Sequence, residues 1–259
     1  MAARLDSLLR RSGRDLFLPL TFRLAQRLEQ VAPEEFAGDP ALAAFVLRSA
    51  QKLFGADGTV NWFDPALESA SAGSDPASPE ALLKRPPLNA ALELARRLAG
   101  DAGNDELVLG YLTGPATLSR RLAFEHASQI PLAMAKAYCE ANVSGLLLAE
   151  EAPLGPETVV HCETLAPLFN LAAYYGIPVL LLPRHRPDPA VVERMHAMGA
   201  RIAGPGPGEI VTLPIGERAR AECVAGWERG SGRLVLSAWD IPPETAPEDV
   251  VAVARQVRG

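Results

Sequence analysis

Short apolar runs alternate with longer helical patterns along the whole chain. This alternation is typical of parallel strands that are joined by helices. The eight predicted strands cover residues 16–20, 59–63, 107–113, 145–149, 177–182, 201–204, 210–213 and 234–238. Eight such strands within 259 residues predict an α/β protein with a (β/α)8 TIM-type barrel. No repeat or linker divides the sequence, so we expect a single domain over residues 1–259.

Cap residues mark the ends of the helical patterns. Asp39 and Asp188 each precede a proline, and Asp followed by Pro is typical of a helix start. Glycines are common just after a helix, and those expected there are Gly55, Gly100, Gly176 and Gly199. The predicted helices cover residues 39–54, 89–98, 128–141, 156–175, 189–198, 217–228 and 247–257. A basic, amphipathic first helix is expected within residues 1–14.

Two segments interrupt the regular alternation. Residues 69–87 are rich in Ser, Ala and Pro and are predicted to form a loop long enough to cover a site. The sequence GPGPG at residues 204–208 joins two predicted strands without a helix between them. One βα unit is therefore truncated, and we expect an irregular or truncated barrel near residues 204–209.

Composition narrows the class of partner. The net charge of −6 argues against a nucleic-acid partner, because phosphate binding needs clustered Lys and Arg. The apolar runs are far shorter than the roughly 20 residues of a membrane span, and no apolar stretch follows the basic start as it would in a secretory signal. Three widely spaced cysteines without a CxxC motif fit reduced thiols in a cytoplasm. We therefore expect a cytoplasmic protein with no membrane partner. The sequence leaves open whether it forms a homodimer.

Reactive groups of a parallel barrel lie at the C-terminal ends of its strands. Arg23 and Arg27 follow the first predicted strand, and Trp62 and Asp64 stand at the end of the second. The candidates after later strands are residues 111–115, Glu150, Glu151, residues 184–186, Trp239 and Asp240. Arginine pairs bidentately with carboxylates and indole rings stack on flat groups. This mixture predicts a small anionic, carboxylated and partly flat substrate.

Each candidate also has a purely structural interpretation. Asp64 precedes Pro65, and Asp-Pro is a common turn pair. Arg23 and Arg27 are four residues apart and could form a solvated helix face, and Arg184 could belong to an exposed loop. His161 and Cys162 have no second ligand pair at suitable spacing, so no metal site is expected. Motifs for nucleotides or for a serine nucleophile are absent from the sequence.

Four segments together resemble the uroporphyrinogen decarboxylase superfamily, which also contains corrinoid and thiol methyltransferases. Leu18-Pro19 followed by RLAQR at residues 23–27 resembles the pattern RQAGRY. Phe63-Asp64, with Gly73 nine residues further on, is similar to the FSD segment of the family. LTGPATL at residues 112–118 resembles the GP-x-TL turn, and residues 234–251 resemble the last strand and helix with their P-x-T-P-x-x-N-V ending.

The resemblance implies a carboxy-lyase, related to porphyrin biosynthesis, that needs no metal and no organic cofactor. Arg23 and Arg27 would hold substrate carboxylates, and Asp64 would face the reacting ring as the catalytic group. Loss of CO2 leaves electrons that a protonated ring can absorb, and a fixed carboxylate stabilises that cation. The other substrate-binding candidates are Trp62, Arg121, Glu150, Arg184 and Trp239.

Departures from the family pattern keep two alternatives open. Arg121 stands where the decarboxylase has a tyrosine, Trp239 stands where it has a histidine, and EEAP at residues 150–153 replaces the FDSW loop. Uroporphyrinogen itself is therefore a doubtful substrate. Asp64 and Glu68 match the D-x-x-x-E of the methyltransferase branch, although Arg184 and Trp239 replace its zinc ligands. The third interpretation is a non-catalytic barrel that binds an anion or a partner protein.

Overall fold

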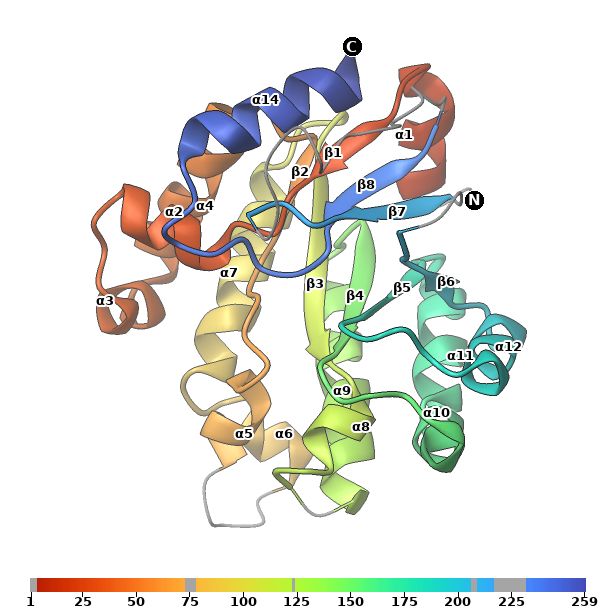
Figure 1. The fold of residues 1–259 in the computed structure, drawn as a ribbon. Helices are drawn as coiled ribbons and strands as arrows, with labels where there is room; N and C mark the ends of the chain where they lie inside the picture. Colours follow the sequence, from red (N-terminus) through yellow and green to blue (C-terminus); the bar gives the residue numbers. More distant parts are fainter. Residues whose placement is uncertain (1–3, 73–77, 123, 206–208, 217–231) are drawn as a thin grey trace.

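The computed structural model describes residues 4–72, 78–122, 124–205, 209–216 and 232–259 (Figure 1). All strand pairs in it are parallel, and they form two sheets with the orders β2-β3-β4-β5-β6 and β1-β8-β7. The strands are β1 (Leu16–Leu18), β2 (Gly58–Val60), β3 (Leu107–Thr113), β4 (Gly145–Glu150), β5 (Val179–Pro183), β6 (Arg201–Ile202), β7 (Ile210–Leu213) and β8 (Leu234–Ser237). Each contains or overlaps a predicted strand.

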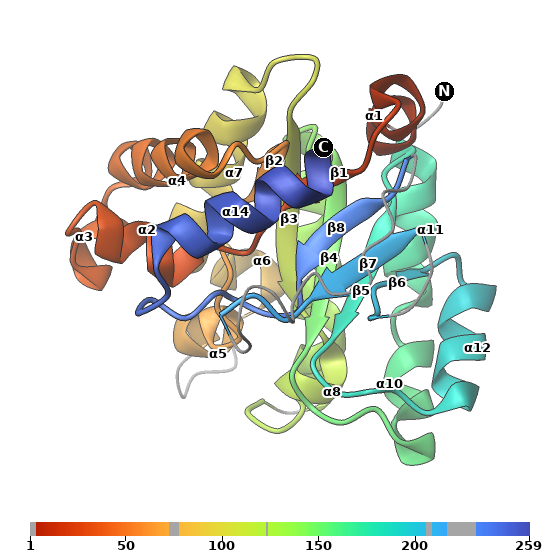
Figure 2. The same cartoon turned by 45° about the horizontal axis from the view of Figure 1, so that its top comes forward.

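Two seams join these sheets into an irregular (β/α)8 TIM-type barrel. At the first seam, the Asp57 N–H donates to the Phe17 carbonyl oxygen at 2.8 Å, and the Phe17 N–H donates to the Asp57 carboxylate at 2.8 Å. At the second seam, the Thr212 N–H donates to the Gly204 carbonyl oxygen at 2.9 Å. The second seam lies in the region that the sequence predicted to be irregular. Figure 2 shows β1, β8 and β7 side by side.

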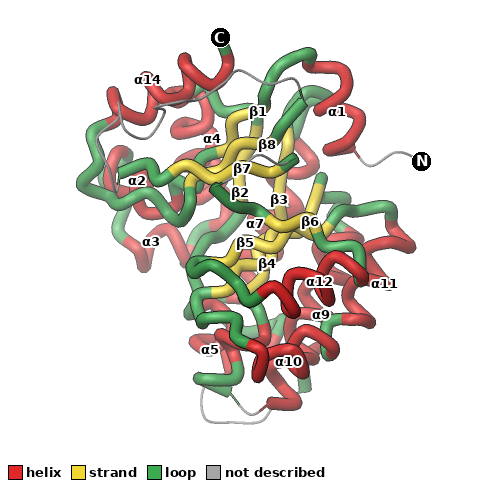
Figure 3. Tube along the Cα trace, turned by 45° about the vertical axis from the view of Figure 1, so that its right-hand side comes forward, coloured by secondary structure: helices red, strands yellow, loops and turns green. Residues whose placement is uncertain are grey.

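Helices surround the strands on the outside of the molecule (Figure 3). They are α1 (Arg4–Ser12), α2 (Phe22–Leu28), α3 (Pro33–Gly38), α4 (Pro40–Phe54), α5 (Leu67–Ala72), α6 (Pro79–Leu82), α7 (Leu88–Asp101), α8 (Pro115–Leu118), α9 (Phe124–Glu140), η1 (Pro156–Thr158), α10 (Val159–Glu163), α11 (Ala166–Tyr175), α12 (Pro189–Ala197) and α14 (Pro247–Arg258). No helix among the described residues is long and apolar enough to cross a membrane.

The continuous apolar runs form the core because both faces of these strands are covered. Every residue of β3 and β4 is buried, as expected for parallel strands between helices and a packed barrel interior. Gly110 in β3 lies under the ring of Tyr138 on α9, where a Cβ atom would overlap the ring carbons. This close approach brings α9 against the sheet.

Three expectations about helices and loops need correction. The segment 69–87 is not one continuous loop: α5 begins before it and α6 lies within it, while residues 73–77 lie outside the description. Asp64 accepts a hydrogen bond from the Ala66 N–H, and Ser78 caps α6 by accepting one from the Ala81 N–H. Gly100 lies inside α7 rather than after it, and the predicted helix 156–175 is divided into η1, α10 and α11.

The remaining glycine predictions are confirmed. Gly55 and Gly176 end α4 and α11 in the left-handed conformation, with φ of 60° and 68°. Gly199 has a φ of 94° and directly follows Met198, the C-cap residue of α12. The predicted helix 217–228 and the GPG of residues 206–208 lie outside the described part of the chain.

The strand ends define a functional face and an opposite face. β3 ends at the bottom of Figure 1, where α5, α6 and α8 lie close to it. The first helix, α1, and the C-terminus lie toward the other end of the molecule. The residues that follow the strands are therefore expected at the end of the barrel toward which β3 points.

Candidate functional site

A cavity of about 510 Å³ opens at the C-terminal ends of the strands, a size that fits a small molecule. Side chains from the segments that follow β1, β2, β4, β5 and β8 reach it. The lining residues are Phe22, Arg23, Gln26, Pro33, Phe63, Asp64, Pro65, Glu151, Arg184, Trp239 and Asp240. Chain segments up to about two hundred residues apart in sequence therefore share one pocket.

Arg23 and Asp240 form an ion pair on one side of this pocket. The Nε of Arg23 donates to the Oδ2 of Asp240 at 2.7 Å. The Arg23 side chain is 59% exposed, whereas that of Asp240 is 2% exposed. Burial raises the pKa of Asp240 to about 6, although the hydrogen bond and charge of Arg23 act in the opposite direction. The buried Asp240 thus holds Arg23 through its Nε, which leaves the two terminal guanidinium nitrogens available to the pocket.

Arg184 and Trp239 form a second contact on the same side. The Arg184 guanidinium carbon lies 5.1 Å from the centre of the Trp239 ring, within the range of a cation–π interaction. The backbone N–H of Arg184 donates to the Glu150 carbonyl oxygen at 2.8 Å, which fixes the start of the loop after β5 beside β4. Trp239 also packs edge-on against Phe63, with 5.0 Å between ring centres. The aromatic pair supplies an apolar floor beside two guanidinium groups.

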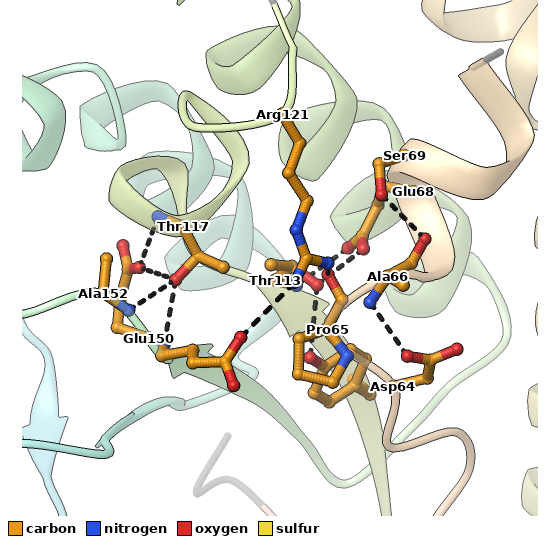
Figure 4. A network of polar contacts seen from close by, with 12 residues as sticks. Asp64, Pro65, Ala66, Glu68, Ser69, Thr113, Thr117, Arg121, Glu150 and Ala152 are labelled. Atoms are coloured by element: carbon orange, nitrogen blue, oxygen red, sulfur yellow. Dashed lines mark hydrogen bonds and ion pairs between the residues drawn. The ribbon is translucent and has the colours of Figure 1, made fainter.

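Arg121 connects the loops on the other side of the pocket (Figure 4). Its Nη1 donates to the Pro65 carbonyl oxygen at 2.6 Å, and its Nη2 lies 3.4 Å from Oε2 of Glu151. Asp64 precedes Pro65, and one of its carboxylate oxygens caps the start of α5 at the Ala66 N–H, 2.9 Å away. Asp64 therefore does stabilise a turn, and the same side chain also lines the cavity.

Two buried glutamates fix the turn after β3 from opposite sides (Figure 4). Glu68 accepts hydrogen bonds from the Thr113 N–H at 2.8 Å and from its hydroxyl at 2.6 Å. Glu150 accepts from the Ala116 N–H, the Thr117 N–H and the Thr117 hydroxyl, at 3.0, 2.9 and 2.6 Å. Burial raises the pKa of Glu68 and of Glu150 to about 7, against the opposing effect of these hydrogen bonds. Glu68 thus holds the end of β3, and Glu150 holds the start of α8.

The structure brings together half of the eight residues predicted to be catalytic or substrate-binding. Arg23, Asp64, Arg184 and Trp239 all line the cavity. The other four candidates, Arg27, Trp62, Arg121 and Glu150, are not among the lining residues.

Each of these four residues has a structural partner or neighbour instead. Arg27 donates to the Thr245 carbonyl oxygen at 3.1 Å, and Trp62 packs behind the pocket against Phe22 and Phe36. Arg121 bridges the two loops and Glu150 holds α8. Their roles in substrate binding stay predictions.

Several lining residues were not chosen from the sequence as site residues. Asp240 and Glu151 follow strands directly, so the strand-end rule identifies them as candidates, but no feature of the sequence distinguishes them from their neighbours Trp239 and Glu150. Phe22 and Pro33 have no sequence signal, because apolar residues near a strand end are equally typical of the core. Their place in the pocket is a result of the path of the chain through α2 and α3.

This chain has no zinc ligand at the two positions where the methyltransferase branch places them. The methyltransferase branch would place its ligands after the fifth strand and in the last-strand motif, where this chain has Pro183, Arg184 and Trp239. No group of three or more His, Cys, Asp or Glu side chains able to hold a metal occurs in the described ranges. Cys139 and Cys162 are unpaired and buried on helices, and Cys223 lies outside the description.

The fold and the pocket define a (β/α)8 barrel whose candidate site lies at the C-terminal ends of its strands. No protein-family model matches the sequence, and no curated protein matches it. The structure is similar to that of a methyltransferase from Methanosarcina mazei, with a TM-score of 0.70 and 15% identity over 99% of both chains. It is also similar to the homocysteine methyltransferase MmuM from Escherichia coli, with a TM-score of 0.61 and 15% identity over 98% of this chain and 99% of that one. At this identity the similarity shows a shared fold.

Proposed function

We propose that this chain is an enzyme of the uroporphyrinogen decarboxylase superfamily that acts on a small carboxylated substrate. One observation supports the proposal: Arg23, Arg184 and Asp64 follow three different strands, yet all three line one cavity of about 510 Å³. Planar guanidinium groups bind carboxylates bidentately. A carboxylate between them would leave the rest of the substrate beside Asp64 and the rings of Phe63 and Trp239.

Methyl transfer is the reaction that the fold comparison favours. Both solved structures described above are methyltransferases, and their barrels align with nearly all of this chain. In this reaction the acceptor atom loses its proton to a nearby carboxylate and attacks the methyl carbon, and the donor leaves with the electrons of the broken bond. Asp64 and Glu151 both lie at the pocket as candidate bases. The acceptor would be activated by a carboxylate, because zinc ligands do not fit.

Decarboxylation is the second candidate, and the position of Asp64 supports it. An arginine-bound substrate that loses CO2 would leave its electrons in its own ring or carbonyl system. A fixed carboxylate beside that system stabilises the cationic form that absorbs them. Neither a metal nor an organic cofactor is needed for this route.

One product analysis distinguishes the two reactions. The purified protein is incubated with carboxyl-labelled aromatic acids and amino acids, each with and without a sulfonium methyl donor or a methylcorrinoid. Labelled CO2 in the headspace identifies a decarboxylase, and a methylated acid identified by mass spectrometry identifies a methyltransferase. Asp64→Asn should lower the rate of either reaction about a hundredfold, while the exposed control Asp105→Asn keeps it. Binding without either product would instead favour the non-catalytic barrel.

A further inference from the structure

Both basic and acidic side chains line the pocket. We call Arg23 and Arg184 the basic wall: Arg23 is paired with Asp240, and the Arg184 guanidinium lies over the ring of Trp239. The acidic wall consists of Asp64 and Glu151, which Arg121 connects through its contacts with Pro65 and with Glu151. All four charged wall residues line the same cavity.

The basic wall keeps nitrogen atoms available for an anion. Arg23 uses its Nε for Asp240, and its two terminal nitrogens make no hydrogen bond to a described residue. Arg184 is exposed, and its guanidinium is held by stacking over Trp239 rather than by an acid in the described ranges. Each arginine therefore has guanidinium nitrogens with which it can bind a carboxylate.

The acidic wall keeps oxygen atoms available for a cation. Asp64 uses Oδ1 for the Ala66 N–H, while its Oδ2 accepts no hydrogen bond from the described part of the chain. Glu151 is paired with Arg121 through Oε2 at a loose 3.4 Å, and its side chain is 40% exposed. A negative charge of the substrate placed beside these two carboxylates would be repelled by them, whereas a positive charge there would be attracted.

We infer that the substrate is a zwitterion that carries one carboxylate and one protonated amine. This inference deepens and rests on the proposed function, because it concerns the same pocket. The carboxylate binds at the basic wall and the ammonium at the acidic wall, so each charge of the substrate meets groups of opposite sign. Phe22, Phe63 and Trp239 provide apolar surface for the carbon skeleton between the two ends.

Matched triads of ligands test the inference by calorimetric titration. Each triad holds one zwitterion, the same acid without its amine, and the same amine without its carboxylate. The probes are phenylalanine with hydrocinnamate and phenethylamine, norvaline with valerate and butylamine, and γ-aminobutyrate with butyrate and propylamine. We expect the zwitterion of at least one triad to bind about tenfold or more tightly than both partners.

Variants then assign the amine to the acidic wall. Asp64→Asn and Glu151→Gln should reduce the affinity for the zwitterion about tenfold and leave that for its acid analogue unchanged or tighter. Asp105→Asn, an exposed carboxylate paired with Arg11, is the matched control and should change neither.

The outcomes distinguish a failure of the zwitterion inference from a failure of the proposed function. If each acid binds as tightly as its zwitterion and Arg23→Ala weakens both, the zwitterion inference is wrong and the carboxylate-binding function stands. If no acid and no zwitterion of the panel binds, both the inference and the proposed function are contradicted.

Discussion

Arg23 donates from its Nε to the Oδ2 of Asp240 at 2.7 Å, and this pair joins the first helix after β1 to the end of β8. Asp240 is buried, and burial raises its pKa to about 6. The pair therefore contains a positive charge that faces the pocket and an acid that can lose its charge near neutral pH. A substrate carboxylate would compete with Asp240 for this arginine.

Protonation of Asp240 should strengthen the binding of carboxylates. Above pH 6 the charged Asp240 holds Arg23, and below pH 6 it becomes neutral and releases the guanidinium. We expect the dissociation constant of hydrocinnamate to fall several-fold between pH 7.5 and pH 5.5 in the wild type, as titration calorimetry would measure.

The control for this experiment is Asp240→Asn, which removes the titrating group and keeps the shape. The variant should bind with nearly the same affinity at both pH values. An equally steep pH dependence in the variant would assign the effect to another group.

Glu150 should make the protein less stable as the pH rises through the neutral range. Its pKa is about 7 in the folded protein and near 4.5 in the unfolded chain, so the folded state binds more protons between these values. The free energy of unfolding therefore falls as pH rises from 4.5 to 7, by roughly 3 kcal/mol at most from this group. Urea unfolding at several pH values measures the slope, and Glu150→Gln should make it shallower, while Glu68 and Asp240 still contribute to it. An unchanged slope in the variant would show that Glu150 does not titrate in this window.

Gly114 should be intolerant of a side chain because of Glu150. A Cβ atom at Gly114 would overlap the Glu150 carboxyl group, which is held by three hydrogen bonds to α8. We expect Gly114→Ala to reduce the free energy of unfolding by about 1–3 kcal/mol, as chemical denaturation would show. Gly103→Ala is the matched control, because no atom lies within 4 Å of its Cβ position. Equal stability of the two variants would contradict this packing.

Arg23→Lys should not restore the full affinity for carboxylates. The lysine ammonium keeps the charge but lacks the planar fork that can hold Asp240 and a ligand at the same time. We expect titration calorimetry to give an affinity between those of the wild type and Arg23→Ala. An affinity equal to that of the wild type would show that only the charge matters here.

Much of the barrel could be predicted from the sequence because its strands are buried on both faces. The run at residues 107–113 coincides with β3, and that at residues 210–213 coincides with β7. Caps were predictable where one residue decides the conformation, as Gly55 and Gly176 show with their positive φ values. The short helices α5 and α6 were missed, because each has only one or two turns and α6 depends on the local cap Ser78 within a segment rich in Ser, Ala and Pro.

The candidate site was predicted only in part, for a physical reason. The strand-end rule identifies where side chains begin, and Arg23, Asp64, Arg184 and Trp239, which it singled out, line the cavity. It does not determine where a long side chain ends. Arg27 is one helical turn beyond Arg23, yet its guanidinium reaches the Thr245 carbonyl oxygen instead of the cavity. That difference depends on packing between α2 and the segment before α14, which is not visible in the spacing of two arginines.

The central claim is that the basic wall binds a carboxylate, and titration calorimetry with hydrocinnamate and phenylalanine tests it most directly. We predict that Arg23→Ala and Arg184→Ala each weaken binding of these ligands about tenfold or more. Arg97→Ala, on the exposed face of α7 beside Glu93, should leave it unchanged. Arg27→Ala should also leave it unchanged if only the lining residues bind the substrate. Affinities of Arg23→Ala and Arg184→Ala equal to that of the wild type would contradict the account.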